Sequence, residues 1–143
     1  MNIKFGCLDF DKVLKFLIDT DNEFQSPLST KVNLEEYARK LSAFSSFAYC
    51  EEDGDIAGMI SCYTNSPPSG YISNVCIKKK HQGKGLFSQM FSVLLQNCKS
   101  IGIGVIRLEV NNDNISAQNI YRHTGFTECG QARNQSIYME YII

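Results

Sequence analysis

The residues best suited to chemistry lie in a short basic segment between an apolar stretch and an amphipathic one. The sequence runs from YISNVCI through KKKHQGKGLFS into QMFSVLL, with Gly83 and Gly85 at the junction. The first N–H groups of a helix lack partners within the helix, and the helix macrodipole adds partial positive charge there. Because glycine lets such a backbone approach a bulky anion, we interpret the junction as a phosphate-binding turn. A strand-to-helix turn that needs glycine for steric reasons alone is the alternative.

The segment resembles the acetyl-CoA loop of the GCN5-related N-acetyltransferase (GNAT) family. That loop follows a Gln/Arg-x-x-Gly-x-Gly/Ala pattern after a central strand, and the sequence here is Gln82-Gly83-Lys84-Gly85-Leu86-Phe87. Phe87 departs from the pattern, because the family usually has a small residue at that position. A second family signature, Asn-x-x-Ala-x-x-x-Tyr-x-x-x-Gly-Phe, is carried by Asn114, Ala117, Tyr121, Gly125 and Phe126. The resemblance covers residues 56–126 well and the two ends only by general layout.

The resemblance implies an acetyl-CoA-dependent N-acetyltransferase that moves an acetyl group directly to a primary amine of a small molecule or a peptide. Backbone N–H groups of the turn would bind the pyrophosphate. The strand before the turn would splay from its neighbour and pair with the pantetheine arm. Phe87 would disturb the tightness of the turn unless its ring points into the core. The cofactor-binding residues implied in this way are Val75, Cys76, Ile77, Gln82, Gly83, Lys84, Gly85, Leu86, Phe87, Ser88, Asn114 and Tyr121.

The same resemblance implies two catalytic residues. Tyr121 matches the family's usual general acid, and Glu109 matches a position that serves as general base in some members. Each has a simpler alternative, because Tyr121 could be a core aromatic and Glu109 a rim carboxylate paired with Arg107 or a lysine. Asn114 could likewise contact the cofactor, cap its helix, or do both. Cys76 as a nucleophile is disfavoured, because the family generally transfers the acetyl group directly.

A basic cluster adjoins the turn and has two open interpretations, capture of the CoA phosphates or a solvated loop. Nucleic-acid binding is not expected, because the cluster has no interleaved aromatic residues and the net charge of the chain is −1. The six cysteines include no Cys-x-x-Cys pair and no histidine at ligand spacing, so we expect neither a metal site nor a disulfide framework. The basic cluster consists of Lys78, Lys79, Lys80, His81 and Lys84.

Two functions from other classes compete with acetyl transfer. A dinucleotide-binding oxidoreductase is suggested by residues 83–88, which nearly match G-x-G-x-x-G, and by Glu109, which ends the next strand as a ribose-binding acid would. The polar segment between Ile77 and Gly83 argues against it, because that fingerprint turns directly off its strand. The other competitor is a non-catalytic CoA-binding sensor or subunit, against which the presence of Tyr121 argues.

Length and composition limit the remaining possibilities. A chain of 143 residues predicts a single domain, residues 1–143, large enough to bury a core. No apolar run approaches the length of a membrane span, and the first residues, MNIKFGCLDFDK, lack the apolar region of a signal peptide. We therefore expect a cytoplasmic protein that acts without a membrane. Whether it is a monomer or a homodimer is left open.

Hydrophobic periodicity predicts the elements that must position these residues. Apolar residues at helical spacing indicate helices over residues 9–19, from a capping box at Asn33, after Gly85 and after Asn114. Their order with the strands, β-α-α-β-β-β-α-β-α-β-β, predicts an α/β fold with a mixed sheet flanked by helices, the layout of the GNAT family. By resemblance, the polar segment 19–33 and the two helices that it joins would select the acceptor; a solvated connection is the alternative. The predicted strands are residues 1–5, 47–50, 56–64, 71–77, 105–110, 126–129 and 136–141.

Overall fold

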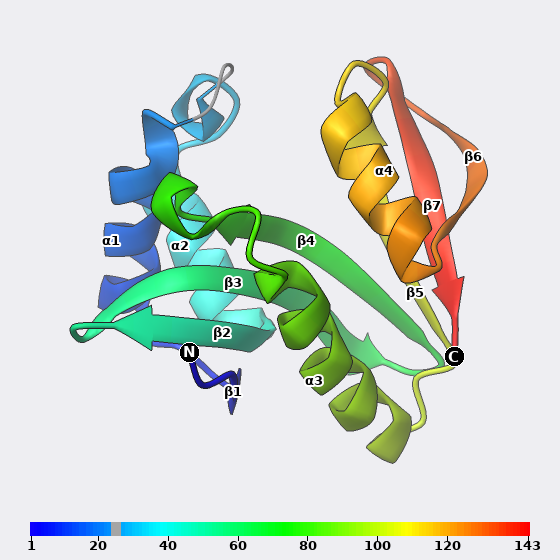
Figure 1. The fold of residues 1–143 in the computed structure, drawn as a ribbon, viewed down its shortest axis with the longest axis horizontal. Helices are drawn as coiled ribbons and strands as arrows, with labels where there is room; N and C mark the ends of the chain where they lie inside the picture. Colours follow the sequence, from blue (N-terminus) through cyan, green and yellow to red (C-terminus); the bar gives the residue numbers. More distant parts are fainter. Residues whose placement is uncertain (24–26) are drawn as a thin grey trace.

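The computed structural model describes residues 1–23 and 27–143, which form a mixed sheet with helices on both faces (Figure 1). The strands are β1 (Lys4–Gly6), β2 (Ser46–Glu52), β3 (Asp55–Ser66), β4 (Ser69–Ile77), β5 (Val105–Asn111), β6 (Thr127–Ala132) and β7 (Ser136–Ile142). The helices are α1 (Phe10–Asp21), α2 (Leu34–Phe44), α3 (Leu86–Ser100) and α4 (Ile115–Thr124), with short 3₁₀ turns η1 (Leu28–Thr30) and η2 (Lys79–His81).

The strands lie in the order β1-β2-β3-β4-β5-β7-β6. The pair β4–β5 is parallel, whereas the other five pairs are antiparallel. The predicted order of elements and the α/β class are confirmed. The predicted strand bounds were too short at several ends, chiefly in β3 and β6, because strand pairing continues into the polar residues that flank each apolar run.

Two cores lie on opposite faces of the sheet. Helices α1 and α2 cover one face with apolar residues that include Val13, Phe16 and Leu41. Helix α3 covers the other face, where Met90 and Leu94 are fully buried. Successive residues of a strand point to opposite faces, and β2 accordingly contributes to both cores.

Local sequence explains where the helices begin and end. The Asn33 side chain accepts the Glu36 N–H at 3.0 Å and caps α2, as the sequence predicts. The Asp9 carboxylate caps α1 in the same way, accepting the Lys12 N–H at 2.9 Å. Gly125 ends α4 with φ of 120°, a backbone conformation that favours glycine. A Cβ at Gly125 would lie 2.9 Å from the Tyr141 ring, so the position is closed to larger residues.

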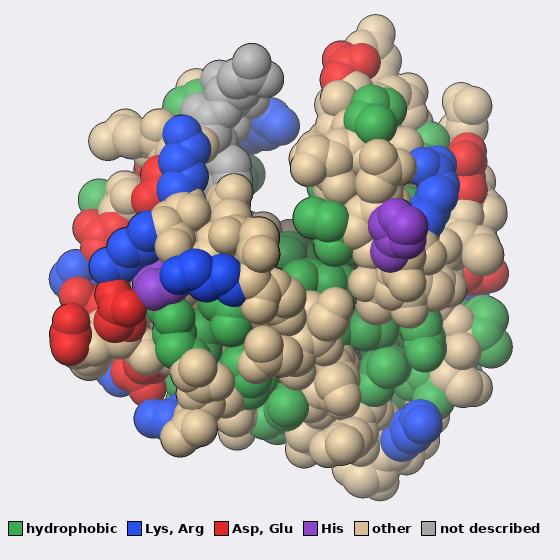
Figure 2. Space-filling model, in the orientation of Figure 1, with side chains coloured by type: hydrophobic (Ala, Val, Ile, Leu, Met, Phe, Trp, Pro, Cys, Tyr) green, Lys and Arg blue, Asp and Glu red, His purple; other side chains and the backbone are tan. Residues whose placement is uncertain are grey.

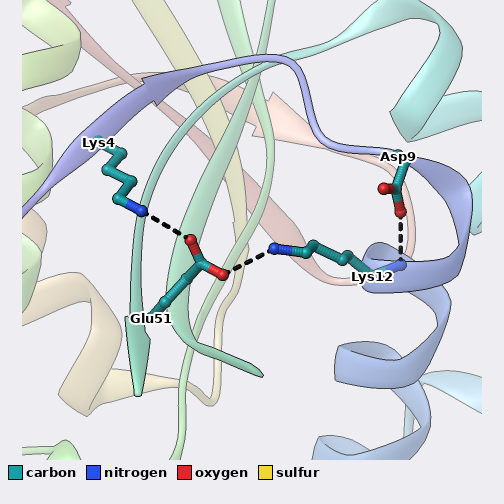
Figure 3. Close-up of polar contacts among 4 residues, drawn as sticks. All are labelled: Lys4, Asp9, Lys12 and Glu51. Carbon is teal, nitrogen blue, oxygen red and sulfur yellow. Dashed lines mark hydrogen bonds and ion pairs between the residues drawn. The ribbon is translucent and has the colours of Figure 1, made fainter. Parts of the chain in front are cut away.

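Glu51 fastens the first strand and first helix to the sheet (Figure 3). Its carboxylate lies on β2 and accepts hydrogen bonds from the Lys4 ammonium at 3.0 Å and the Lys12 ammonium at 2.8 Å. The hydrogen bond from Lys12, and after it the one from Lys4, holds the pKa of Glu51 below its usual range. One carboxylate therefore joins β1 and α1 to β2.

Only a short stretch of β4 pairs with β5. It extends from Ser69↔Val105 to Tyr71↔Arg107 and then stops, although β4 continues to Ile77 and β5 to Asn111. Figure 1 shows the two strands diverging beyond this point. The second half of β4 therefore has a strand partner on the β3 side and an opening on the other side.

None of the helices in the described ranges is long and apolar enough to cross a membrane.

Candidate active site

The free edge of β4 presents backbone groups to the opening. The Lys78 N–H donates to the Ala57 carbonyl at 3.0 Å, so Lys78 faces β3. Residues along an antiparallel strand alternate between facing a partner and facing away. The N–H and C=O groups of Val75 and Ile77 therefore face the opening, as those of a strand ready to pair would.

The glycine turn follows directly. Gly83 and Gly85 have φ of 76° and 75°, the left-handed region that favours glycine. No side chain caps α3, and its backbone ladder begins with Gln89 N–H to Gly85 C=O at 3.2 Å, which leaves the N–H groups of the first turn to an external acceptor. A Cβ added at either glycine would meet no atom within 4 Å. The space in front of the helix N-terminus is thus open, as an anion site requires.

Gln82 has a positioning role. Its side-chain amide donates to the Ile77 carbonyl at 2.9 Å and so ties the glycine turn to the end of β4. The side-chain amide is thereby used within the chain. Lys84 and Ser88 are exposed beside the same turn, whereas Leu86 is buried.

Phe87 points into the core, so it leaves the front of the turn open. The residue is 6% exposed, and its ring stacks on Phe91 with centroids 5.7 Å apart. It also meets the Tyr121 ring edge-on, with centroids 5.5 Å apart. The aromatic residue at this unusual position thus joins the first turn of α3 to the tyrosine of α4.

Tyr121 lies on the α3 side of the sheet, packed on Phe87 and Phe126. Burial raises the pKa of Tyr121 to about 12. With that pKa the phenol is protonated at neutral pH. Its hydroxyl makes no hydrogen bond to any described residue and is therefore free to donate one. The core-aromatic alternative and the general-acid role both fit this placement.

Asn114 caps α4, because its side-chain oxygen accepts the Ala117 N–H at 3.2 Å. The capping alternative therefore holds, and its side-chain oxygen is occupied in this arrangement. The residue remains exposed at the mouth of the site.

Glu109 lies on the opposite face of β5 from the α3 core, since its neighbours Leu108 and Val110 are buried in that core and it is exposed. Arg107, which the sequence offered as its partner, pairs instead with Glu140 at 3.2 Å. No ion pair within the described residues involves Glu109. The two candidate catalytic groups thus lie on opposite sides of the opening.

The basic cluster is partly neutralised by acidic residues. The Lys80 ammonium lies 2.6 Å and the His81 Nε2 3.1 Å from the two carboxylate oxygens of Glu52. The Lys79 N–H donates to the Glu23 carboxylate at 2.8 Å. The ammonium groups of Lys78, Lys79 and Lys84 have no carboxylate partner in the described parts of the chain. Part of the cluster therefore braces η2, and part remains available to an anion.

Cys76 belongs to the α1 core and is 5% exposed. Burial raises the pKa of the Cys76 thiol to about 11. A thiol that is neutral and buried is a poor nucleophile, since the thiolate is the reactive form. Its contribution to the opening is confined to its place in the strand between Val75 and Ile77.

Gln118 positions α4 and is not evident from the sequence. This residue is 5% exposed, and its amide donates to the carbonyls of Asn111 at 2.9 Å and Asn112 at 3.1 Å. These carbonyls lie at the last residue of β5 and the residue after it, so Gln118 sets where α4, and with it Tyr121, lies against the opening. A polar residue on the buried face of a predicted helix was the available signal.

On the face of the sheet covered by α1, β4 borders a cavity of about 160 Å³. The end of α1 and η1 form its other walls. The buried Asn74 Oδ1 on its wall has no hydrogen-bond partner among the described residues. Residues 24–26 of the predicted acceptor segment lie outside the described residues. The cavity is lined by Leu17, Thr20, Leu28, Lys31, Asn74, Val75 and Cys76.

The structure brings the edge of β4, the glycine turn and Tyr121 to one opening, with Glu109 on its far side. Figure 2 shows the surface deeply hollowed between the α1 side of the molecule and α4. A narrow ligand can lie along the edge of β4 with an anionic group at the N-terminus of α3 and its other end near Tyr121. The side chains of Tyr121 and Glu109 lie on opposite faces of the sheet at that end.

Comparison with known proteins bears on this geometry. The model of the acetyltransferase (GNAT) family matches residues 12–126. N-acetyltransferase family 8 member 2 of Rattus norvegicus is 26% identical over 95 residues, which are 63% of this chain and 42% of the rat protein. The chain spans less than half the length of the curated relatives that it matches.

Two solved structures show the same fold. The ribosomal-protein-S18-alanine N-acetyltransferase of Escherichia coli superposes with a TM-score of 0.78 at 16% identity, covering 99% of this chain and 94% of the other. The paia N-acetyltransferase of Thermoplasma acidophilum, solved with coenzyme A, gives a TM-score of 0.77 at 17% identity over 100% of both chains.

Proposed function

The chain belongs to the acetyltransferase (GNAT) family, and from that premise we propose that it transfers an acetyl group from acetyl-CoA directly to a primary amine. The observation that carries the proposal is the early end of β4–β5 pairing, which leaves a free strand edge leading into an uncapped helix N-terminus. A strand edge can pair with an amide-rich arm, and a helix N-terminus can hold a pyrophosphate. Acetyl-CoA carries an amide-rich pantetheine arm and a pyrophosphate next to each other, in the order in which the strand edge and the helix N-terminus follow one another.

Different residues of the chain would bind different parts of acetyl-CoA. Backbone N–H groups of residues 83–88 would hold the pyrophosphate, with Lys84 beside them. Val75 and Ile77 would pair with the pantetheine arm, although the Ile77 carbonyl is already shared with Gln82. When bound, acetyl-CoA supplies an acetyl carbonyl activated as a thioester.

The two proton transfers fall to groups on opposite faces. Glu109 would take the proton that the amine loses as its nitrogen bonds to the acetyl carbon. Tyr121 would donate to the sulfur as the carbon–sulfur bond breaks. Because the acid and the base lie across the opening from each other, the amine and the thioester would enter from different sides and meet without an acetylated enzyme. The cavity beside Asn74, lined in part by the end of α1 and by η1, would lie on the amine's side.

Binding of acetyl-CoA tests the first half of the proposal, with a matched pair of glycine variants. Gly85 and Gly102 both have left-handed φ, 75° and 86°, and a Cβ at either meets no atom within 4 Å. Alanine at each should therefore cost a similar strain, about 1–2 kcal/mol. Only Gly85→Ala places a methyl group before the N-terminus of α3. Alanine is the better probe than valine, because a branched residue adds strain of its own at this φ.

Calorimetry should show acetyl-CoA affinity reduced about 10- to 150-fold in Gly85→Ala, the equivalent of one lost hydrogen bond to a charged group. The affinity of Gly102→Ala should match that of the unmodified protein. Equal affinities for both variants would remove the glycine turn from the site, and tight binding of NAD instead would favour the oxidoreductase. Release of free thiol from acetyl-CoA with a panel of amines tests catalysis. Binding without release for any amine would indicate a sensor.

A further inference from the structure

Strand β4 carries a β-bulge at Ser73, close to the point where it leaves β5. The β3–β4 register passes from Ser61↔Asn74 directly to Cys62↔Ile72, so Ser73 is an extra residue without a partner on β3. A bulge of this kind bends its strand and increases the local twist. Pairing of β4 with β5 ends two residues before Ser73, so the bend comes where the two strands begin to separate.

The two cores show what the extra residue does to β4. Residues four apart in a regular strand lie on the same face of a sheet. Ile72 is buried in the core under α3, yet Cys76 is buried in the core under α1. On β3, by contrast, Ile60 and Cys62 both lie in the core under α3, as a regular strand requires. The bulge therefore turns over the second half of β4, which is the half that borders the opening.

Hydrogen bonds from two other elements hold Ser73 in place. The Tyr37 hydroxyl of α2 donates to the Ser73 carbonyl at 2.9 Å. On the β3 side, the hydroxyls of Ser73 and Ser61 lie 2.8 Å apart, and the Ser73 hydroxyl donates to the Ser61 carbonyl at 3.4 Å. Ser61 is fully buried, so this contact is shielded from water. The bulge is thus fastened to α2 and to β3 at a single residue.

Tyr37 is suited to hold this carbonyl. The extra residue of a bulge is left unpaired in the strand ladder, and a carbonyl that is partly buried needs a donor from elsewhere. Burial raises the pKa of Tyr37, so the phenol keeps its proton at neutral pH and can donate it to the Ser73 carbonyl. Tyr37 lies in the first turns of α2, shortly after the cap at Asn33. The link therefore joins the helix that follows the segment 19–33 to the strand edge that leads to the glycine turn.

We propose that Tyr37 is a positioning residue, whose hydroxyl fixes the bulge at Ser73 and so holds the second half of β4 apart from β5. A bulge that shifts along a strand turns each residue that it passes to the other face. Fixing it at Ser73 therefore sets the direction of Val75 and Ile77 before a ligand arrives, and a preformed edge lowers the cost of ordering on binding. The consequence for acetyl-CoA rests on the proposed function, whereas the effect on the strand does not.

Amide hydrogen exchange of the full chain without acetyl-CoA tests the effect on the strand. Tyr37→Phe keeps the ring and removes the hydroxyl, so the amides of residues 72–76 should exchange about two- to tenfold faster, the range set by one neutral hydrogen bond. The amides of β7 should change less. Tyr63→Phe is the matched control, because Tyr63 packs on the same core and its hydroxyl makes no hydrogen bond within the described ranges. Exchange in that variant should match that of the unmodified protein.

Calorimetry and steady-state kinetics test the consequence for binding. Tyr37→Phe should weaken acetyl-CoA binding and raise the KM for acetyl-CoA about two- to tenfold. The kcat at saturating acetyl-CoA should be unchanged, because the bound ligand then occupies the strand edge and holds it open. Ser61→Ala removes the other link to Ser73. Since both links act on one residue, the loss of affinity in the double variant should differ from the product of the single losses by at least about twofold.

Unaltered acetyl-CoA affinity in Tyr37→Phe, with faster exchange spread evenly over the sheet, would make Tyr37 a residue that only stabilises the fold and would overturn the inference. Equal losses in Tyr37→Phe and Tyr63→Phe would do the same, as would a double variant whose loss equals the product of the single ones. Failure of the unmodified protein to bind acetyl-CoA would refute the proposed function instead. In that case the exchange of residues 72–76 still decides whether Tyr37 fixes the bulge.

Discussion

Tyr121→Phe removes the hydroxyl that we expect to assist departure of the thiolate, and keeps the ring that packs on Phe87 and Phe126. The hydroxyl has no hydrogen-bond partner among the described residues, so its loss breaks no bond within the fold. The free energy of unfolding should therefore change by less than about 0.5 kcal/mol. Acetyl-CoA affinity should also be preserved.

The pKa of the phenol decides how Tyr121 can assist departure of the thiolate, and the strength of a hydrogen bond then gives the size of the effect. Burial raises the pKa of Tyr121 to about 12, whereas a reference thiol has a pKa of about 8.5. Full proton transfer to the sulfur is thus uphill by about 3.5 pK units, or about 4.8 kcal/mol. We expect Tyr121 to stabilise the thiolate chiefly as a hydrogen-bond donor. Such a bond to a charged group contributes about 1.5–3 kcal/mol, so kcat should fall about 10- to 150-fold.

Single-turnover release of thiol from acetyl-CoA measures the chemical step. Tyr141→Phe is the control, because Tyr141 packs in the same aromatic cluster on β7, against Phe91 and Phe126. Its kcat should equal that of the unmodified protein. An unchanged chemical rate in Tyr121→Phe would reduce Tyr121 to packing, and equal losses in both variants would point to disturbance of the aromatic cluster.

Three further changes test other parts of the structure. Gln118→Glu leaves the carbonyls of Asn111 and Asn112 without their donor, so it should cost about 1–3 kcal/mol in chemical denaturation and lower kcat by displacing Tyr121; unaltered stability would show that these bonds do not hold α4. Cys76→Ala should keep the kcat of the unmodified protein, and mass spectrometry of the unmodified protein after incubation with acetyl-CoA alone should find no acetylated cysteine, because the Cys76 thiol is buried with a pKa of about 11; an acetyl adduct at Cys76 would contradict direct transfer. Glu51→Gln should lower Tm at pH 7, and because pairing lowers the pKa of Glu51 in the folded state, the stability it provides is present above pH 4.5 and lost as the pH falls through the folded pKa. The difference in Tm should accordingly shrink toward pH 3, and a constant difference would mean that packing, and not charge, explains the loss.

The sequence predicted the backbone of the site well, because its signals are local. Glycines at 83 and 85, the cap at Asn33 and the helical spacing of the apolar residues each depend on near neighbours in the chain. The order of elements followed from these signals, and the family pattern placed the turn at the N-terminus of α3.

Side-chain partners were harder to predict, because they depend on contacts between distant segments. Arg107 of β5 pairs with Glu140 of β7, so it is not the ion-pair partner of Glu109, a choice that the sequence left open. The direction of the Phe87 ring depends on Tyr121 and Phe91 being packed beside it. The buried amide of Gln118 finds its partners only after α4 has docked against β5.

The short pairing of β4 with β5 also bears on how this protein avoids aggregation. β4 is fourth in the order of seven strands, yet beyond Tyr71 it offers an unpaired rim like that of an outermost strand. Exposed rims of this kind are where foreign strands add, and proteins usually protect them with charge, bulges or a covering segment. Here the bulge between Ser61 and Cys62 bends the rim, and a bound acetyl-CoA would occupy it. Depletion of the cofactor would then leave the middle of the sheet, and not its ends, as the place where one molecule can join another.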